Sequence, residues 1–476
     1  MLKTNVLLFF FLFLSFLGLT QNNTTLLSPK NGQFISDSVA LKWRDFDDSQ
    51  EKFYVNIAFD SLFTNIVLND STITNSYTSF LSIDSIYYWR IGLKYNNQNP
   101  IIWEATESFN YFNPSTTDSL KVWYMGVDST ITSIGDSISQ VRNIIGPHFN
   151  ANIISSHHPK KKSEFDFEFI NFTKNELFQF NLLDLKKTST IFTLVKITGS
   201  YGDILLSDFG GVHYLFWLQN NNNIFYRSSA YKSITNANLN LDQWFILGLK
   251  RENDSISFYK NDIFLEKKTG SFDDFNISYL GGKGNSTSPF EGGLAELLIY
   301  DESLSQNSID DVTNYLMDKY APPVSIGGSH QLNTFCMDTI KPSKFAYTSY
   351  LWSTGEIDSL ILINQTGWYS VTVTDIFGRI SIDSVYVQYP VIKQPTTNSF
   401  CQNDSLTWNT QLNNSDFNFL WSDTSTDSIL NIIQVGDYWL KVTDSQGCFR
   451  YSDTLSIAVD SFPVLTNLGL DKTICQ

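Results

Sequence analysis

Three carboxylates stand at alternate positions of one short segment, Glu164-Phe165-Asp166-Phe167-Glu168. Alternate side chains of a β-strand point to the same face, so this spacing on a strand would bring the three carboxylates together. Two carboxyl groups about 5 to 5.5 Å apart can hydrolyse a glycosidic bond with retention of configuration. Positions i and i+4 of a straight strand are about 13 Å apart, so only a bulged strand would let Glu164 and Glu168 act together. Catalysis at this segment is therefore an alternative hypothesis and not the leading one.

A predicted hairpin carries a different kind of chemistry, that of a sugar-binding surface. Aromatic faces beside amide and hydroxyl groups can contact sugar rings and bind their hydroxyls. The hairpin consists of a strand at 213–217, a turn of four Asn residues and a strand at 224–227. Because side chains alternate, Trp217 shares one face with Leu215, Tyr214 lies on the other, and one of the two faces must be core. The candidate ligand-binding residues are Tyr201, Tyr214, Trp217 and Tyr226.

Composition restricts the elements that can position these residues. The 476 residues include 32 Lys and Arg against 48 Asp and Glu, for a formal net charge of −16. A chain this acidic repels a polyanion, so we expect no nucleic-acid partner. Hydrophobic residues make up 42% and aromatic residues 15%, which is enough for substantial cores. Asn, Ser, Thr and Asp fill the polar positions and favour strands and turns, so the chain is predicted to be all-β.

The N-terminus is typical of a secretory signal peptide covering residues 1–20. Lys3 supplies a positive charge, residues 6–17 are apolar except for Ser15, and Gly18 and Thr20 are small residues before the predicted cut. A membrane-spanning helix needs about 20 apolar residues, so this run is too short to be one. No comparable apolar run follows. We therefore expect a mature chain without a transmembrane segment that is secreted, with attachment to the outer cell surface left open.

Residues 21–113 are predicted to form a first β-sandwich. About seven short alternating segments are separated by turn residues, a density typical of a sandwich. An early Trp43 and a later Tyr88-Trp89-Arg90 resemble a fibronectin type III domain, which implies a spacer.

Residues 114–322 show many strands followed by one amphipathic helix. The segment from Trp244 to Tyr320 resembles the C-terminal half of a concanavalin A-like, laminin-G-like jelly-roll domain. The resemblance is carried by Gly281-Gly282, by the run FEGGLAELLIY at 290–300 and by YLMDKY at 315–320. It implies a domain that binds a glycan or an extracellular protein. Many such domains hold Ca²⁺ at the rim, and the implied ligands here are Asp203 and Asp208, although no fixed ligand spacing is present.

Residues 323–476 contain an internal repeat with an offset of 69 residues. Trp352, Gly367, Tyr369, Asp375 and Gly378 recur as Trp421, Gly436, Tyr438, Asp444 and Gly447. The repeats resemble the tandem immunoglobulin-like repeats of Bacteroidetes-type surface proteins. They are predicted at 323–390 and 391–460, and residues 461–476 are expected to begin a third repeat that is cut short.

Four cysteines allow three pairings. The preferred pair is Cys401 with Cys448, which would join the first strand of the second repeat to the residue after its Asp-Ser-Gln-Gly turn. Arg379 stands where the first repeat would have the second cysteine, so Cys336 has no local partner. Cys475 is expected to pair beyond the end of the chain.

The sequence thus predicts an all-β chain of several β-sandwiches that acts as a secreted or cell-surface adhesion or carbohydrate-binding protein. The partner would be a glycan or an extracellular protein, with Ca²⁺ as the one cofactor considered. One alternative is a glycoside hydrolase of the concanavalin A-like glucanase type, with Glu164 as nucleophile, Asp166 as helper and Glu168 as acid/base. The other is a structural stalk that binds no ligand.

Overall fold

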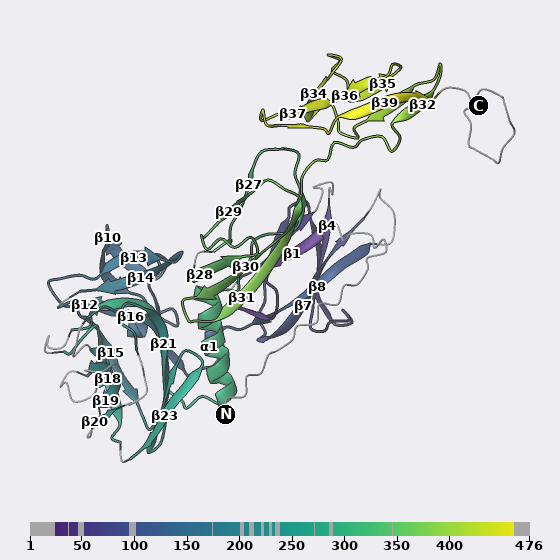
Figure 1. The fold of residues 1–476 in the computed structure, drawn as a ribbon. Helices are drawn as coiled ribbons and strands as arrows, with labels where there is room; N and C mark the ends of the chain where they lie inside the picture. Colours follow the sequence, from purple (N-terminus) through teal and green to yellow (C-terminus); the bar gives the residue numbers. More distant parts are fainter. Residues whose placement is uncertain are drawn as a thin grey trace, which may run out of the picture.

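Strands dominate the structure, a computed structural model, and they are arranged in several β-sandwiches, which confirms the predicted fold class (Figure 1). One α-helix, α1 (Gln306–Tyr320), occurs in the described part of the chain, and no described helix is long and apolar enough to cross a membrane. The structure describes residues 24–36, 38–45, 52–94, 101–173, 175–199, 204–208, 214–219, 223–227, 231–233, 239–270, 272–284, 289–344 and 346–460.

The N-terminal sandwich has two facing sheets whose inner side chains form one apolar core. Trp43, Tyr87 and Trp89 are all buried there, and the Trp89 indole donates a hydrogen bond to the Pro29 carbonyl over 2.7 Å. One sheet contains β1 (Thr24–Ser28), β3 (Ser38–Asp45) and β6 (Ser76–Phe80). The other contains β2 (Gln33–Ile35), β8 (Ile102–Tyr111), β7 (Ser85–Leu93), β4 (Phe53–Ala58) and β5 (Ile66–Thr72).

The central sandwich is the largest unit, and its strands form one continuous hydrogen-bonded network. One apolar core lies between its layers, and a second lies between an outer sheet face and α1. The strands are β9 (Leu120–Met125), β10 (Ile131–Ile134), β11 (Ser137–Val141), β12 (Ala151–Ile153), β13 (Lys160–Glu164), β14 (Phe167–Phe172), β15 (Phe178–Leu185), β16 (Thr188–Ile197), β17 (Ile204–Ser207), β18 (Tyr214–Gln219), β19 (Asn223–Arg227), β20 (Tyr231–Ser233), β21 (Trp244–Glu252), β22 (Ser255–Lys260), β23 (Ile263–Thr269), β24 (Phe275–Leu280) and β25 (Gly292–Tyr300).

A buried carboxylate fastens α1 to the sheet beneath it. Glu296, on β25, is 0% exposed and lies among apolar neighbours, so its charge needs partners. It accepts four hydrogen bonds, from Trp123 Nε1 (2.7 Å), Tyr315 Oη (3.0 Å), Lys319 Nζ (2.6 Å) and Tyr320 Oη (2.7 Å). Burial, followed by the Glu296 charge, raises the pKa of Tyr320 well above its usual value, so this hydroxyl remains a donor.

Two similar C-terminal sandwiches follow α1, and their equivalent residues play equivalent roles. The indoles of Trp352 and Trp421 are buried and donate to the carbonyls of Asp358 and Asp427, which are also 69 residues apart. The first sandwich contains β26 (His330–Gln331), β27 (Asp338–Ile340), β28 (Tyr347–Trp352), β29 (Ile361–Ile363), β30 (Gly367–Asp375) and β31 (Ile380–Gln388). The second contains β32 (Ser399–Cys401), β33 (Leu406–Asn409), β34 (Phe417–Trp421), β35 (Ile429–Ile432), β36 (Gly436–Tyr438), β37 (Leu440–Asp444), β38 (Phe449–Tyr451) and β39 (Leu455–Asp460).

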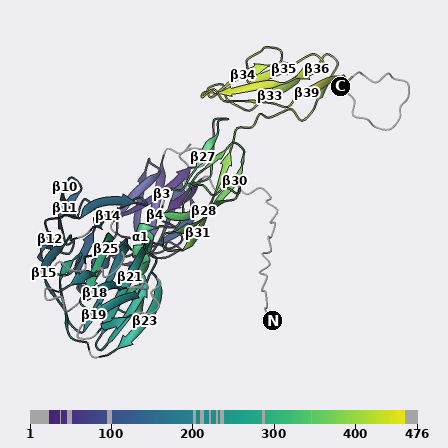
Figure 2. The ribbon, with the colours of Figure 1, turned by 60° about the vertical axis from the view of Figure 1, so that its left-hand side comes forward.

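The C-terminal end of α1 joins three sandwiches. Asp318 accepts a hydrogen bond from the Phe34 backbone N–H (2.9 Å) on one side and from Arg379 Nη1 (2.8 Å) on the other. Arg379 Nη2 also donates to the last carbonyls of the helix, at Met317 and Ala321. The helix therefore lies between the central sandwich and the two units that flank it, the N-terminal and first C-terminal sandwiches (Figures 1 and 2).

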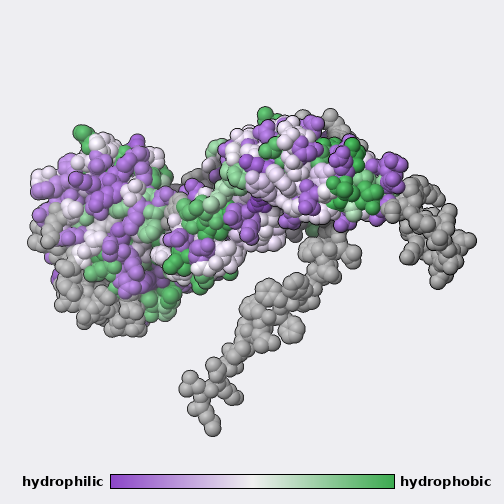
Figure 3. All heavy atoms as spheres, turned by 45° about the horizontal axis from the view of Figure 1, so that its top comes forward, coloured by the Kyte–Doolittle hydropathy of each residue, from purple (hydrophilic) through white to green (hydrophobic). Residues whose placement is uncertain are grey.

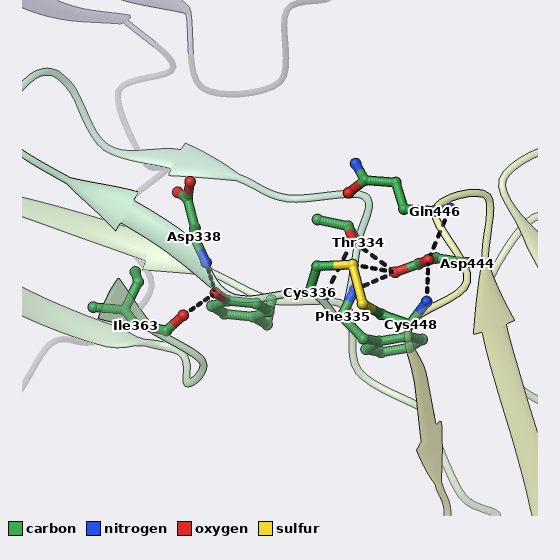
Figure 4. The surroundings of a disulfide bond; sticks show 9 residues. Thr334, Phe335, Cys336, Asp338, Ile363, Asp444, Gln446 and Cys448 are labelled. Atoms are coloured by element: carbon green, nitrogen blue, oxygen red, sulfur yellow. Dashed lines mark hydrogen bonds between the residues drawn. A yellow bond between two sulfur atoms is a disulfide. The ribbon is translucent and has the colours of Figure 1, made fainter. Parts of the chain in front are cut away.

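The predicted pairing of Cys401 with Cys448 is wrong. Cys448 is bonded to Cys336, with Cα atoms 5.3 Å apart (Figure 4). Cys401 lies opposite Asp460 at one end of the second C-terminal sandwich, whereas Cys448 follows the Asp444 turn at the other end. A disulfide needs Cα atoms within about 7 Å, so these two cannot meet. Cys401 is itself disulfide-bonded, and Cys475 lies outside the described residues.

The Asp444 turn explains why Cys336 is the partner. One carboxylate oxygen of Asp444 accepts hydrogen bonds from Thr334 Oγ1 (2.6 Å) and the Phe335 N–H (2.7 Å). The other oxygen accepts the N–H of Cys448 (2.9 Å) in its own turn. These hydrogen bonds outweigh the effect of burial and lower the pKa of the Asp444 carboxyl. The charged carboxylate therefore holds the two cysteine-bearing segments side by side.

Removing the disulfide with the double substitution Cys336→Ser and Cys448→Ser is expected to destabilise the second C-terminal sandwich by about 2–4 kcal/mol, because its unfolded chain gains freedom. Chemical denaturation followed by hydrogen exchange of peptides from this sandwich would measure this loss, because the 11 Trp residues of the chain make its fluorescence report on every unit at once. Met337→Ser is the control, since Met337 adjoins Cys336 and is 66% exposed. An unchanged denaturation midpoint in the double variant would contradict a stabilising role for the bond.

Candidate functional site

A cleft of about 440 Å³ lies between the central sandwich and the first C-terminal sandwich. Each sandwich contributes one wall, so the site exists only because α1 and Arg379 hold the two units together. The central sandwich contributes Glu164, Phe165, Asp242, Gln243, Trp244, Phe245, Lys260 and Asn261. The first C-terminal sandwich contributes Thr348, Thr374, Asp375, Ile376, Phe377 and Gly378.

Two carboxylates share one ammonium group on the central wall. Glu164 Oε2 accepts a hydrogen bond from Lys196 Nζ (2.6 Å) and another from Trp244 Nε1 (3.1 Å). The same Lys196 Nζ lies 3.5 Å from an oxygen of Asp242. Lys196 has a side chain only 14% exposed, whereas the Asp242 side chain is 76% exposed. Asp242 can therefore reach a ligand in the cleft while Glu164 is held in a fixed position.

The remaining walls supply uncharged polar groups and aromatic rings. Asn261 has a positive φ of 54° in the turn between β22 and β23, and its Oδ1 accepts the Ile246 N–H over 3.0 Å. Thr348 is exposed and Thr374 is half-buried, so both hydroxyls can be reached from solvent. Phe165 and Phe377 are half-buried and come from opposite walls. The cleft thus combines hydroxyls and carboxylates with apolar ring surface.

The three predicted carboxylates do not share a strand face. Phe165 and Asp166 both have positive φ, 50° and 64°, and form a two-residue turn between β13 and β14. Across this hairpin Glu164 pairs with Phe167, and Ser163 pairs with Glu168. Because neighbouring positions point to opposite faces, Glu164 and Glu168 lie on opposite faces of the hairpin.

Glu168 is engaged away from the cleft. It lies 3.3 Å from Lys161 Nζ, and it accepts the Asp128 N–H over 3.2 Å. Asp166 is exposed in the turn itself. The predicted arrangement of nucleophile, helper and acid/base is therefore not formed, and Glu164 is the one member of the set that lines the cleft.

The structure describes part of the predicted aromatic site. The expected hairpin is present, with β18 antiparallel to β19. Tyr226 is 1% exposed and its ring contacts Phe272 with centroids 5.5 Å apart, so it belongs to the core and offers no face to a ligand. Tyr214 and Trp217 lie on β18, and their role as ligand contacts stays a prediction. Tyr201 falls outside the described residues.

Calcium binding at Asp203 and Asp208 also stays a prediction. Asp208 follows β17 and is half-buried, and Asp203 lies outside the described residues. Within the described ranges, the one cluster of three or more side chains close enough to share a metal ion is Cys336, Asp444 and Cys448. Its two cysteines are joined to each other, so that cluster is a covalent joint.

A larger depression of about 800 Å³ lies beside β9, between residues 115–121 and 143–149. The side-chain amide of Asn143 in this depression already has structural partners, because it accepts the Trp123 N–H (2.8 Å) and donates to the Lys121 carbonyl (3.0 Å). It is built within one sandwich. The cleft between two sandwiches is therefore the stronger candidate site, since it carries carboxylates and rings from separate units.

The fold and the cleft together define a chain of several β-sandwiches with a site between two of them. No protein-family model matches this chain, and no curated protein matches it. Solved structures give weak similarities. Domain 4 of AbnA, a GH43 extracellular arabinanase from Geobacillus stearothermophilus in complex with arabinotriose, shares 16% identity, with a TM-score of 0.34, over 41% of this chain and 98% of its own.

Two further solved structures show similarity at the same level. The IT-sialidase CBM40 of Ruminococcus gnavus bound to α2,3-sialyllactose shares 17% identity over 32% of this chain and 97% of its own, with a TM-score of 0.25. The heptameric SAP-like pentraxin of Limulus polyphemus shares 13% identity over 32% of this chain and 84% of its own, with a TM-score of 0.27.

Proposed function

We propose that this chain binds neutral oligosaccharides in the cleft between its central and first C-terminal sandwiches. The proposal is supported mainly by one observation: the two walls of the cleft together present hydrogen-bonding side chains and aromatic rings. The Asp242 carboxylate can accept hydrogen bonds from sugar hydroxyls. The Thr348 hydroxyl, which donates to the Thr374 carbonyl over 3.2 Å, can accept one as well, and Phe377 offers apolar surface beside them. Such a combination of a few polar groups with aromatic surface is what orients a sugar in a binding site.

Charge favours a neutral ligand. Lys196 lies between the carboxylates of Glu164 and Asp242, and Arg379 is paired with the cleft residue Asp375 (2.8 Å). The charges around the cleft are therefore largely compensated locally. The chain as a whole carries a net charge of −16, which disfavours the approach of anionic glycans.

We further propose that the protein is exported and acts outside the cell as an adhesion or carbohydrate-binding protein. The signal-peptide pattern at residues 1–20 supports export, and so does the disulfide between Cys336 and Cys448, because such bonds persist in oxidising compartments. In this proposal the N-terminal and second C-terminal sandwiches act as spacers around the binding unit.

The proposal predicts that Glu164→Gln weakens oligosaccharide binding by about tenfold or more. Glu164 lines the cleft, and the substitution would remove one charge-assisted hydrogen bond between its carboxylate and a sugar hydroxyl, which contributes about 1.5 kcal/mol. Titration calorimetry of the full chain with arabinotriose, xylotriose, cellotriose and anionic α2,3-sialyllactose would measure affinity. Glu168→Gln is a matched control, because the same change four residues away falls on the opposite hairpin face. Asp242→Asn tests the same wall at a side chain 76% exposed, where folding is not at risk.

We expect binding of at least one neutral trimer, loss of binding in Glu164→Gln and Asp242→Asn, and no change in Glu168→Gln. Equal loss in all three variants, or binding of sialyllactose alone, would contradict the proposed site. Cleavage of an oligosaccharide that disappears in Glu164→Gln would show a hydrolase and overturn simple binding.

A further inference from the structure

One exposed sheet face on the first C-terminal sandwich carries no charge at its outward positions. Strands β28, β30 and β31 lie side by side, and the inner side of this sheet forms a core. Side chains on the outer side are exposed or half-buried. The outer positions named below hold hydroxyls, apolar groups and rings, and none of them is charged. These residues are Ser349, Leu351, Trp368, Ser370, Thr372, Thr374, Ile380, Ile382, Ser384 and Tyr386.

The uncharged face begins at the cleft and leads away from it. Thr374 lines the cleft and is also the last outward position of β30. Going back along the strand from the cleft, the outward positions are Thr372, Ser370 and Trp368, and Trp368 lies six residues or about 20 Å from Thr374. The far end carries Trp368, 68% exposed, beside Tyr386 on the next strand, with ring centroids 5.4 Å apart.

The second C-terminal sandwich shows that the fold does not require an uncharged face. Across the 69-residue repeat, Trp368 and Thr372 correspond to Asp437 on β36 and Lys441 on β37. Asp437 is exposed and Lys441 is half-buried. The second sandwich does expose apolar side chains (Figure 3), and the charges among them distinguish its face from that of the first. The charge-free face therefore occurs on the sandwich that borders the cleft.

We infer that this face extends the cleft and binds the continuation of a linear neutral oligosaccharide whose end lies in the cleft. The inference rests on the proposed function. Hydroxyls of Thr372 and Ser370 can exchange hydrogen bonds with sugar hydroxyls, and the apolar faces of sugar rings can stack on Trp368 and Tyr386. An extended ligand of this kind gains affinity from each unit without meeting a charge that it would have to desolvate.

The test compares short and long ligands on the full chain. Trimers and octamers of linear arabinan, xylan and β-1,4-glucan are titrated against the unmodified protein, Trp368→Ala and Trp439→Ala. We expect the octamer of the bound type to bind at least tenfold more tightly than its trimer. Trp368→Ala should remove this difference and leave trimer binding unchanged. Trp439→Ala is the matched control, an exposed Trp of the second C-terminal sandwich.

The outcomes separate the two proposals. Equal affinity for trimer and octamer, or an octamer affinity unaffected by Trp368→Ala, overturns the extended site while the cleft proposal stands. Failure of every trimer and octamer to bind overturns the cleft proposal and the extension with it. If Trp368→Ala abolishes self-association in sedimentation and leaves glycan affinities unchanged, the face is a contact between copies of the chain and the inference is wrong.

Discussion

Replacing Glu296 with alanine is expected to destabilise the central sandwich by about 3–5 kcal/mol, because a buried hydrogen-bond network loses the carboxylate at its centre. Four donors converge on this carboxylate, and three of them, Tyr315, Lys319 and Tyr320, come from α1. Without the carboxylate, the Lys319 ammonium group loses its ion pair, and the buried Tyr320 hydroxyl keeps only the 3.3 Å hydrogen bond to the Ala295 carbonyl. The helix should then detach from the sheet more readily.

Hydrogen exchange measured by mass spectrometry would follow this detachment directly, since amides of α1 should exchange faster. Glu296→Gln keeps an oxygen that can accept from Trp123 but loses the ion pair with Lys319, so we expect an intermediate effect. Glu302→Ala is the control for the same residue type, because Glu302 is exposed and its contact with Ser119 is at the surface. Exchange in α1 that does not change in Glu296→Ala would refute the anchoring role.

Arg379→Ala is expected to loosen the first C-terminal sandwich from α1 by a comparable 3–5 kcal/mol, roughly the cost of breaking a buried ion pair. Its guanidinium bridges Asp375 and Asp318, whose carboxylate side chains are only 6% and 10% exposed. The charges of Asp318 and Asp375 outweigh burial and raise the pKa of Arg379. The alanine variant leaves both carboxylates without this partner.

The consequence of Arg379→Ala should be seen in shape and in binding. Small-angle scattering should show a more extended chain, and affinity for the cleft ligand should fall because the two walls no longer hold a fixed separation. Arg379→Lys should rescue little, since an ammonium cannot reproduce the forked geometry of the guanidinium. Arg142→Ala is the control, because Arg142 is exposed and its guanidinium donates to the Ser129 carbonyl within the central sandwich. A scattering profile identical to that of the unmodified chain would contradict the role of Arg379 in holding the first C-terminal sandwich against α1.

The same position joins each C-terminal sandwich to the unit before it, by different chemistry. Asp375 and Asp444 are equivalent, and each accepts the N–H four residues later, from Arg379 and Cys448. In the first sandwich that fourth residue forms the ion pair with α1, and in the second it forms the disulfide with Cys336. The turn is thus a repeated connector, and the side chain at its last position determines how the connection is made.

Much of the architecture could be predicted because local sequence patterns indicate it. The 69-residue offset placed Trp352 and Trp421 in equivalent buried positions, and the structure gives them the same hydrogen bond. The helical period after Leu304, with Ser305 as its cap, is the helix α1 with Ser305 accepting the Ser308 N–H. These features depend on residues that are close in the chain.

The site was less predictable, because it depends on turns without the usual signals and on contacts between units. Phe165-Asp166 lacks the glycine or asparagine of common two-residue hairpin turns, so the segment resembled a continuous strand. The turn reverses the chain and separates Glu164 from Glu168. Asp242, which completes the carboxylate pair, had no motif of its own to mark it.

The all-β class, the helix position and the repeat follow from the amino-acid sequence alone, because alternation, helical period and offset are patterns that can be read along the chain. The bond between Cys448 and Cys336, and the sharing of Lys196 by Glu164 and Asp242, became visible only in the folded chain. Those pairs come from separate strands or separate sandwiches. Their distances follow from how the units pack around α1, and no local pattern encodes that geometry.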